Sequence, residues 1–257
     1  MTLVKQSFLD FSGKWVVVTG ASAGIGQACA LELGKHGARL VLVGRNESAL
    51  AKTFSLLDGE GHEVLRLDLS DLPKISAEVL RIAKKVGRLY GLCHAAGITA
   101  TSPLSTSTFD VIQPMMTVNV LAGLELARIV TRRDVMEPEG GSMVFLSSIY
   151  GRGGVAGETG YCATKGAITA AVRAMAIELA RRRIRVNSIS PGLVKTPMTD
   201  KALSVLSSAQ VTAIEEKHPL GPGTALDVAR AAVFLLAPAT SWITGIDLAV
   251  DGGYSAQ

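Results

Sequence analysis

Residues 15–26 read Trp-Val-Val-Val-Thr-Gly-Ala-Ser-Ala-Gly-Ile-Gly, and they fix the start of the fold. The opening residues form an apolar, β-branched run of the kind found in strands that are buried on both faces. A glycine-rich segment follows, and residues 27–36 then keep a helical pattern that stops at Gly37. Because glycine permits close approach of the backbone and a helix N-terminus directs N–H groups at an anion, this stretch predicts a strand, a phosphate-binding loop and a helix.

The loop suits the pyrophosphate of a dinucleotide, and the residues expected to bind it are Gly20, Ser22, Gly24, Ile25 and Gly26. The spacing of its glycines differs from the usual G-x-G-x-x-G fingerprint. A tight turn without a ligand is the alternative reading. The strand before the loop and the helix after it favour the binding function.

Strand and helix patterns alternate along the rest of the chain. Further strands are expected at residues 39–43, 64–68, 89–94, 142–146, 184–189 and 246–250, and helices at 47–57, 73–86, 109–133, 161–182 and 226–236. Pro114 lies near the start of the longest helix as a possible kink. The alternation predicts the α/β class: a single-domain Rossmann fold, with a doubly wound parallel sheet of about seven strands and helices on both faces.

No repeat or break in composition divides residues 1–257, so we expect one domain. The exception in pattern is residues 191–224, a long connection rich in Ser, Thr, Pro and Gly, with a helical piece around 202–215. Connections of this length in compact domains are usually functional, and we expect a substrate lid here. A helical insertion that serves only for packing is the alternative.

Composition and charge exclude several classes of function. The formal charge of +4 and the pI near 9.0 do not indicate nucleic-acid binding, because basic residues are scattered among acidic ones and aromatic residues make up only 5%. Cys29, Cys93 and Cys162 have no metal-ligand spacing, so we expect reduced thiols and no metal site. The sequence shows no signal peptide and no run of about 18 apolar residues, which predicts a cytoplasmic protein without membrane contact.

The end of the second predicted strand reads Gly44-Arg45-Asn46. A carboxylate at this point of a dinucleotide-binding fold would accept hydrogen bonds from the adenosine ribose and repel a 2′-phosphate. This chain instead offers a guanidinium, which suits a phosphate. We therefore predict NADP(H) rather than NAD(H), bound in part by Arg45 and Asn46, with an arginine that merely faces solvent as the alternative.

Tyr161 and Lys165 are one helical turn apart and so share a face of their predicted helix. A nearby cation favours phenolate over phenol, so the pair could transfer a proton near neutral pH. Taken alone, a Tyr-x-x-x-Lys pair is common by chance. Two serines, Ser147 and Ser148, precede the pair, and a buried amide at Asn119 needs partners.

Small or polar residues follow two other strands. Asp68 closes the third strand, where its carboxylate could meet an adenine amino group, with Leu69 beside it. His94-Ala95-Ala96-Gly97 follows the fourth strand, and its small residues would let a cofactor lie close.

Together these residues resemble the short-chain dehydrogenase/reductase family over essentially the whole chain. The matching motifs are T-G-x-x-x-G-x-G at Thr19–Gly26, A-A-G at Ala95–Gly97, Asn119, Ser148, Tyr161-x-x-x-Lys165, Asn187 before Pro191-Gly192, and Asp251-Gly252-Gly253. The resemblance implies a catalytic tetrad of Asn119, Ser148, Tyr161 and Lys165. It also implies that Pro191, Gly192, Val194 and Thr196 lie against the nicotinamide carboxamide, and that Ala95, Ala96 and Gly97 border the cofactor.

The same resemblance implies roles for the tetrad. A nicotinamide cofactor would deliver hydride to a carbonyl carbon while Tyr161 gives a proton to the oxygen, which Ser148 holds. Lys165 would bind the nicotinamide ribose and lower the pKa of Tyr161, and Asn119 would position a water that resupplies the proton. His94 departs from the family, which usually has Asn there, and we interpret it as a local structural substitute.

The fold does not name the substrate. The sequence is most similar to 3-oxoacyl-carrier-protein reductases and to small carbonyl or xylulose reductases. The expected function is an NADP(H)-dependent oxidoreductase acting on CH–OH groups, first of all a 3-oxoacyl thioester reductase. A reductase of sugars, polyols or other small carbonyl compounds and a nonenzymatic NADP-binding protein stay as alternatives, whereas an epimerase is disfavoured because a separate C-terminal substrate domain is absent from the pattern.

Several features bear on partners. Glu137 and Glu139 stand where a carrier-protein reductase would place a basic residue, although Arg181–Arg183 could serve instead. Arg152 and Glu158 are candidate substrate contacts, with solvated loop charges as the alternative. By resemblance, a homotetramer or homodimer would form on the helices that contain Asn119 and Tyr161.

Overall fold

The computed structural model describes residues 8–257. A seven-stranded parallel sheet has the order β3-β2-β1-β4-β5-β6-β9. Its strands are β1 (Trp15–Thr19), β2 (Arg39–Gly44), β3 (Glu63–Arg66), β4 (Gly91–His94), β5 (Gly141–Leu146), β6 (Ile184–Pro191) and β9 (Asp247–Val250). The predicted doubly wound, single-domain fold is confirmed.

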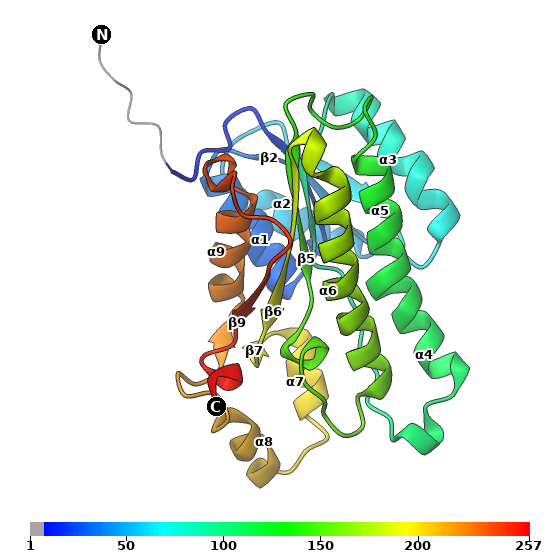
Figure 1. The fold of residues 1–257 in the computed structure, drawn as a ribbon, viewed down its shortest axis with the longest axis vertical. Coiled ribbons are helices and arrows are strands. Elements are labelled where there is room, and N and C mark those ends of the chain that lie inside the picture. The colour runs from blue at the N-terminus through cyan, green and yellow to red at the C-terminus, as the bar shows by residue number, and fades with distance from the viewer. Residues whose placement is uncertain (1–7) are drawn as a thin grey trace.

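Helices cover both faces of the sheet (Figure 1). One face carries α1 (Gly24–Lys35), α2 (Glu47–Ser55) and α9 (Ala225–Leu236), and the other carries α3 (Leu72–Val86), α4 (Phe109–Met115), α5 (Ala122–Val130) and α6 (Thr159–Leu179). Side chains alternate between the two cores along each strand: Val16 and Val18 pack with α1 and α9, whereas Val17 packs with α3 and α5. Burial on both faces is why these strands are apolar throughout.

The parallel strands bring their carboxyl ends to one edge of the sheet. Thr19 at the end of β1 pairs with Val43 on β2 and with His94 on β4. The loops that follow these three strands therefore start side by side, as they do in any doubly wound sheet. β3 ends at Arg66, so Asp68 lies just beyond the strand that was expected to include it.

The long helix predicted at residues 109–133 is interrupted. A π-helical turn, Met116–Leu121, separates α4 from α5, and it contains Asn119. The break therefore lies at Asn119 and not at Pro114, which sits within α4. The Asn119 amide bonds to the backbone of Ile98 and to Thr164, and such tertiary contacts can hold a widened turn that sequence patterns do not reveal.

The connection at residues 191–224 folds into four short elements. β7 (Val194–Lys195) pairs with β8 (Gly223–Thr224), and α7 (Pro197–Leu203) and α8 (Ser208–Glu215) lie between them. The single helical piece expected at 202–215 is thus wrong in extent, because the chain leaves the helix after Leu203 and starts a new one with a capping box at Ser207. Figure 1 shows α7 and α8 below the carboxyl end of β6.

None of the helices within residues 8–257 combines the length and apolarity needed to cross a bilayer.

The glycine loop tolerates no side chain at Gly26. A Cβ atom there would stand 2.3 Å from the Gly20 carbonyl oxygen, a backbone atom that cannot move independently. We expect Gly26→Ala to lower the free energy of unfolding by roughly 1–3 kcal/mol, the usual cost of overpacking. Gly154→Ala is the matched control, since a Cβ atom there meets nothing within 4 Å. Urea unfolding followed by circular dichroism compares the two, and equal midpoints would contradict this account of the loop.

Candidate active site

A cleft of about 320 Å³ opens at the carboxyl edge of the sheet. Every residue predicted to bind the cofactor lines it except Asn46. Ser148, Tyr161 and Lys165 also line it, whereas Asn119 lies behind its wall. Pro197, Met198 and Thr199 line the cleft from α7. They were not among the predicted site residues, although they fall within the segment that was expected to form a lid.

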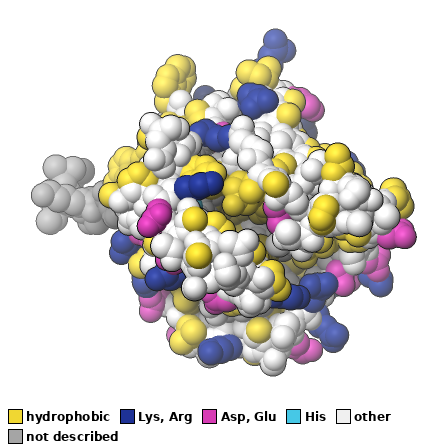
Figure 2. Space-filling view, turned by 90° about the horizontal axis from the view of Figure 1, so that it is seen from below, with side chains coloured by type: hydrophobic (Ala, Val, Ile, Leu, Met, Phe, Trp, Pro, Cys, Tyr) yellow, Lys and Arg dark blue, Asp and Glu magenta, His cyan; other side chains and the backbone are white. Residues whose placement is uncertain are grey.

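Figure 2 views this end of the molecule from below and shows hydrophobic side chains gathered around a hollow. Lys and Arg are interspersed with Asp and Glu on the same face and do not form a continuous basic surface. The scattered charge in the sequence is therefore scattered in space on this face as well.

The first turn of α1 faces the cleft through Gly24, Ile25 and Gly26. No side chain caps this turn, and none of its residues is acidic. Its backbone N–H groups thus lack a side-chain acceptor within the helix, which is the condition for binding an anion at a helix N-terminus. Gly20, in the left-handed region at φ 66°, lets the loop pass close to Ala96, where a Cβ atom would stand 2.9 Å from the backbone nitrogen.

Arg45 projects from the end of β2, and its side chain is 67% exposed. The nearest carboxylate is that of Asp68, 3.9 Å from Nη1, at the outer limit of an ion pair. Asp68 is held by the backbone N–H and hydroxyl of Ser70, which keep the pKa of its carboxyl below the ordinary value. Asn46 points elsewhere: its side chain caps α2 by accepting from the Ala49 N–H.

Lys165 is a buried ammonium, 5% exposed, without a carboxylate partner among residues 8–257. Its Nζ donates to the Leu146 carbonyl at 2.8 Å and lies 5.4 Å from the centre of the Tyr161 ring. Burial lowers the pKa of Lys165 to about 8. The residue therefore exchanges a proton near neutral pH.

Tyr161 behaves differently from the expectation. Burial raises the pKa of its phenol well above the ordinary value, and the Ser148 hydroxyl, which lowers it, only partly offsets that effect. Lys165 does not lower the pKa of Tyr161, because its Nζ lies over the ring and donates to a carbonyl instead. Tyr161 is thus a protonated phenol at neutral pH, and a weaker acid than an exposed tyrosine.

The Asn119 side chain makes three hydrogen bonds to other protein groups. Its Oδ1 accepts from the Ile98 N–H at 2.8 Å, and its Nδ2 donates to the Ile98 carbonyl and to the Thr164 hydroxyl. These bonds tie the loop after β4 to α6, the helix that carries Tyr161 and Lys165. Asn119 therefore fixes the distance between two walls of the cleft.

His94 is buried beneath the same loop. Its Nδ1 lies 3.0 Å from the Thr19 hydroxyl, which also accepts from the Ala96 N–H. Burial lowers the pKa of His94 to about 3, so the imidazole is neutral. Gly123 provides the space for the ring, since a Cβ atom there would stand 2.9 Å from His94 Cδ2. A neutral, buried ring bonded to the end of β1 fits a structural role.

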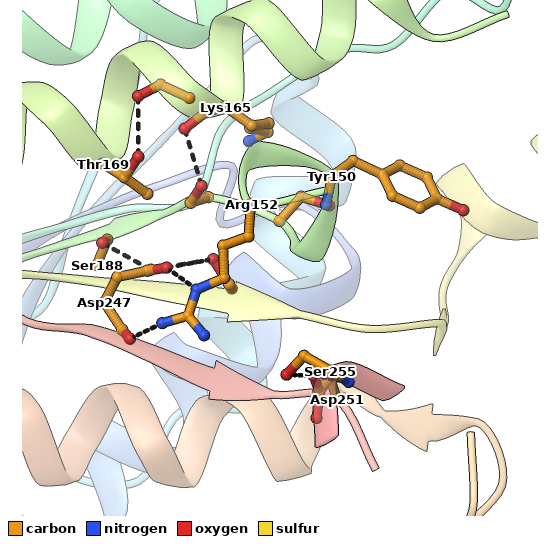
Figure 3. A network of polar contacts seen from close by, with 12 residues as sticks. Tyr150, Arg152, Lys165, Thr169, Ser188, Asp247, Asp251 and Ser255 are labelled. Atoms are coloured by element: carbon orange, nitrogen blue, oxygen red, sulfur yellow. Dashed lines mark hydrogen bonds and ion pairs between the residues drawn. The ribbon is translucent and has the colours of Figure 1, made fainter. Parts of the chain in front are cut away.

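The two loop charges considered as substrate contacts both have protein partners. Figure 3 shows Arg152 extending to Asp247 on β9 while the Tyr150 ring points the other way. Asp247 also accepts from the hydroxyls of Ser188 and Ser190. Glu158 accepts from the hydroxyls of Thr99 and Thr101.

The residues described here hold no group of three His, Cys, Asp or Glu that could bind a metal ion. Cys29, Cys93 and Cys162 are free thiols.

The buried ammonium of Lys165 should destabilise the fold. Its folded pKa of about 8 lies below the ordinary 10.5, so the folded protein binds fewer protons than the unfolded chain between these two values. We expect Lys165→Met to raise the free energy of unfolding at pH 7 by about 1–3 kcal/mol, and the gain to shrink as pH rises from 8 to 10.5 because the wild type then loses its penalty.

Chemical denaturation at several pH values measures this difference, with Lys201→Met as the control because Lys201 is exposed on α7. A Lys165→Met variant that is less stable than the wild type at pH 7 would show that the ammonium stabilises the fold.

Comparisons with known proteins agree with this geometry. A family model described as enoyl-(acyl carrier protein) reductase matches residues 20–255. The 3-oxoacyl-[acyl-carrier-protein] reductase FabG of Rickettsia typhi is 33% identical over 246 residues, which cover 95% of this chain and 98% of that protein.

Solved structures are similar over nearly their whole length. A protein described as a short-chain alcohol dehydrogenase from Sinorhizobium meliloti 1021 has a TM-score of 0.92 at 30% identity, covering 98% of this chain and 100% of its own. A protein described as an NAD(P)-dependent gluconate 5-dehydrogenase from Beutenbergia cavernae, with NADP bound at low occupancy, has a TM-score of 0.90 at 29% identity and the same coverage. The chain belongs to the short-chain dehydrogenase/reductase family of oxidoreductases.

Proposed function

We propose that the protein is an NADP(H)-dependent oxidoreductase that interconverts a ketone and a secondary alcohol, with a 3-oxoacyl thioester as the first substrate class to consider. One observation carries the proposal: the glycine loop, Arg45 and the hydroxyl and ammonium groups of Ser148, Tyr161 and Lys165 line one cleft. The cleft thus joins the residues proposed to bind phosphate to the residues proposed to donate a proton.

The residues of the cleft fit a dinucleotide. The close packing of Gly26 against Gly20 leaves no room for side chains where a pyrophosphate would approach, and the uncapped first turn of α1 offers N–H donors there. We assign Asp68 and Leu69 to the adenine, Ala95–Gly97 and Lys165 to the nicotinamide ribose, and Pro191–Thr196 to the carboxamide. When bound, the nicotinamide supplies a hydride to the substrate carbon or accepts one from it.

The choice of NADP(H) over NAD(H) rests on charge. Arg45 is exposed, only loosely paired with Asp68, and has no carboxylate at Gly44 or Asn46 beside it. A guanidinium in this state is available to a 2′-phosphate, for which its fork of donors is well suited.

The side chains at the other end of the cleft would hold the proton and transfer it to the substrate. Tyr161, whose pKa is raised by burial, keeps its proton until the substrate oxygen becomes basic and then donates it. Ser148 would hold that oxygen by a hydrogen bond. Lys165, with a pKa of about 8, would bind ribose hydroxyls and return a proton toward Tyr161. Asn119 acts as a positioning residue in this scheme, because both N–H donors of its side chain and one acceptor position of its Oδ1 already bond to the protein.

Two features bear on the substrate. The 3-oxoacyl relative favours a thioester. A carrier protein is less well supported: Glu137 is paired with Lys14 at 2.5 Å, and Arg181–Arg183 follow the far end of α6, a helix of 21 residues. At 1.5 Å per residue, this puts them about 30 Å along the helix from Tyr161. We propose that β7, α7, α8 and β8, at residues 191–224, form a lid over the substrate.

Tyr161→Phe removes the proton donor and little else. We expect it to lower kcat by roughly 10²–10⁴-fold, the usual contribution of a positioned general acid. NADPH binding, measured by fluorescence titration, should stay within about threefold of the wild type because the ring and the ribose contacts remain. Retention of full turnover would exclude Tyr161 as the donor.

Arg45→Asp replaces the guanidinium with a carboxylate at the end of β2. We expect the ratio of kcat/KM for NADPH to that for NADH to fall by about 100-fold or more, since a charged hydrogen bond is lost and a repulsion is added. Arg173→Asp, the same charge change on the exposed side of α6, serves as the control. A wild-type preference for NADH would overturn the assignment of the cofactor.

A further inference from the structure

His218 is a buried side chain that does not line the cleft and that the scheme above does not use. It follows the end of α8 by three residues and is 4% exposed. Its Nδ1 lies 3.0 Å from the Ile214 carbonyl oxygen, and its Nε2 lies 2.9 Å from the Leu193 backbone nitrogen. The ring therefore connects the last turn of α8, in the proposed lid, to the backbone just after β6.

The two partners determine which nitrogen of the ring carries the proton. A carbonyl oxygen only accepts, so Nδ1 is the donor to Ile214. A backbone N–H only donates, so Nε2 is the acceptor from Leu193. The imidazole is thus neutral, with its proton on Nδ1. Its Nε2 presents a lone pair to a backbone N–H, which neither an apolar nor a cationic side chain could do.

This bond orients a peptide unit at the wall of the cleft. Gly192 lines the cleft, whereas Leu193 and His218 do not. In a planar trans peptide, the N–H of one residue and the C=O of the residue before it point in opposite directions. Because the Leu193 N–H points at His218, the Gly192 carbonyl points away from the ring. No donor among residues 8–257 bonds to this carbonyl, so it can accept from a ligand.

The surroundings hold the ring in this position. A Cβ atom on Gly192 would stand 2.8 Å from His218 Nε2, so the glycine makes room for the imidazole. The Tyr254 ring packs against the imidazole, with the two centroids 5.0 Å apart. The C-terminus lies beside α8 (Figure 1), and the Gln257 side chain donates to the Lys217 carbonyl at 2.7 Å. The C-terminal segment therefore keeps the histidine in place.

Backbone bonds hold the neighbours of this peptide unit. The Gly192 N–H donates to the Val250 carbonyl at 3.0 Å, and the Leu193 carbonyl accepts from the Gly223 N–H at 2.9 Å. The Leu193 N–H differs from both, because its acceptor is a side chain. Loss of that side chain would leave a backbone donor without a partner while the bonds on either side persist. The orientation of this one peptide unit therefore depends on His218.

We propose that His218 is a positioning residue for the nicotinamide: by accepting from the Leu193 N–H, it orients the peptide whose Gly192 carbonyl can accept from the amide group of the cofactor's carboxamide. The inference rests on the proposed function, which assigns the carboxamide to Pro191–Thr196. It adds a group outside the cleft that acts on the nicotinamide end of the cofactor and not on the adenosine end.

Two amide variants separate this role from simple capping of α8. His218→Gln places its amide oxygen near the position of Nε2 and can accept from the Leu193 N–H, whereas His218→Asn reaches only the position of Nδ1 and can bond to the Ile214 carbonyl. We expect His218→Asn to slow hydride transfer from NADPH to acetoacetamide, a small 3-oxo compound, by about tenfold or more in single turnovers. His218→Gln should stay within about threefold of the wild type, because the bond to Leu193 is kept.

Binding measurements locate the effect along the cofactor. Adenosine 2′,5′-bisphosphate carries the adenine and the 2′-phosphate but no nicotinamide, so its calorimetric dissociation constant should be the same in both variants and the wild type. NADP⁺ should bind His218→Asn about fivefold more weakly, the effect of one lost hydrogen bond.

Hydrogen exchange measures the bond itself without any cofactor. We expect the Leu193 amide, followed by nuclear magnetic resonance, to exchange slowly in the wild type and in His218→Gln. In His218→Asn it should exchange at least about tenfold faster, because its acceptor is gone.

The outcomes separate the two claims. Equal transfer rates in the wild type and His218→Asn, or equal losses in the two variants, would overturn the inference and leave the proposed function standing. An equal loss of affinity for the bisphosphate and for NADP⁺ would also overturn it, since the whole cleft would then be affected. If His218→Asn does not fold, a tenfold slower transfer in His218→Gln overturns the inference. A wild type that binds neither NADP⁺ nor NAD⁺ would refute the proposed function and, with it, the role of His218.

Discussion

A single buried ammonium constrains the centre of this molecule. Lys165 carries its charge inside the protein with a backbone carbonyl, that of Leu146, as its hydrogen-bond partner. The surroundings are shaped to keep it there: the Ser147 hydroxyl bonds to the Lys165 carbonyl at 3.0 Å, and a Cβ atom on Gly97 would stand 3.6 Å from Nζ. A buried charge without a counter-ion is costly, and such sites persist mainly where function requires them.

The sheet brings this ammonium together with the other parts of the cleft. Parallel strands end at one edge of the sheet, so the loops after β1, β2 and β4 and the N-terminal turn of α6 meet there. The topology of the sheet is enough to bring them together. The sequence was sufficient to predict this arrangement for two reasons. Strands that are buried on both faces are continuously apolar, and the loop after the first strand contains glycines, which allow its backbone to pass close to neighbouring atoms. Almost every residue that was predicted to bind the cofactor therefore lines this cleft.

Other features depend on contacts that sequence patterns do not carry. The π-helical turn at Asn119 is held by Ile98 and Thr164, which lie 21 and 45 residues away. Asn46 was expected at the cofactor but caps α2, as a local amide at a helix start often does. Arg185 gave no signal either: its buried guanidinium donates to four carbonyls around the end of α9, from Leu235 to Ile243. The pKa of Tyr161 is also set mainly by burial and not, as the sequence had suggested, by the nearby lysine.

Two cations line the cleft, the exposed Arg45 toward one end and the buried Lys165 toward the other. Relatives of this fold act on different substrates, so such charges, and not the fold, decide what enters. The most direct test of the account follows hydride transfer itself. The protein is incubated with acetoacetamide and NADPH that carries deuterium on one face of nicotinamide C4 and then on the other, and the 3-hydroxy product is examined by mass spectrometry. The account predicts one deuterium on the carbinol carbon from one labelled face and none from the other. A product without deuterium from either face, or no hydroxy product from any ketone, would contradict it.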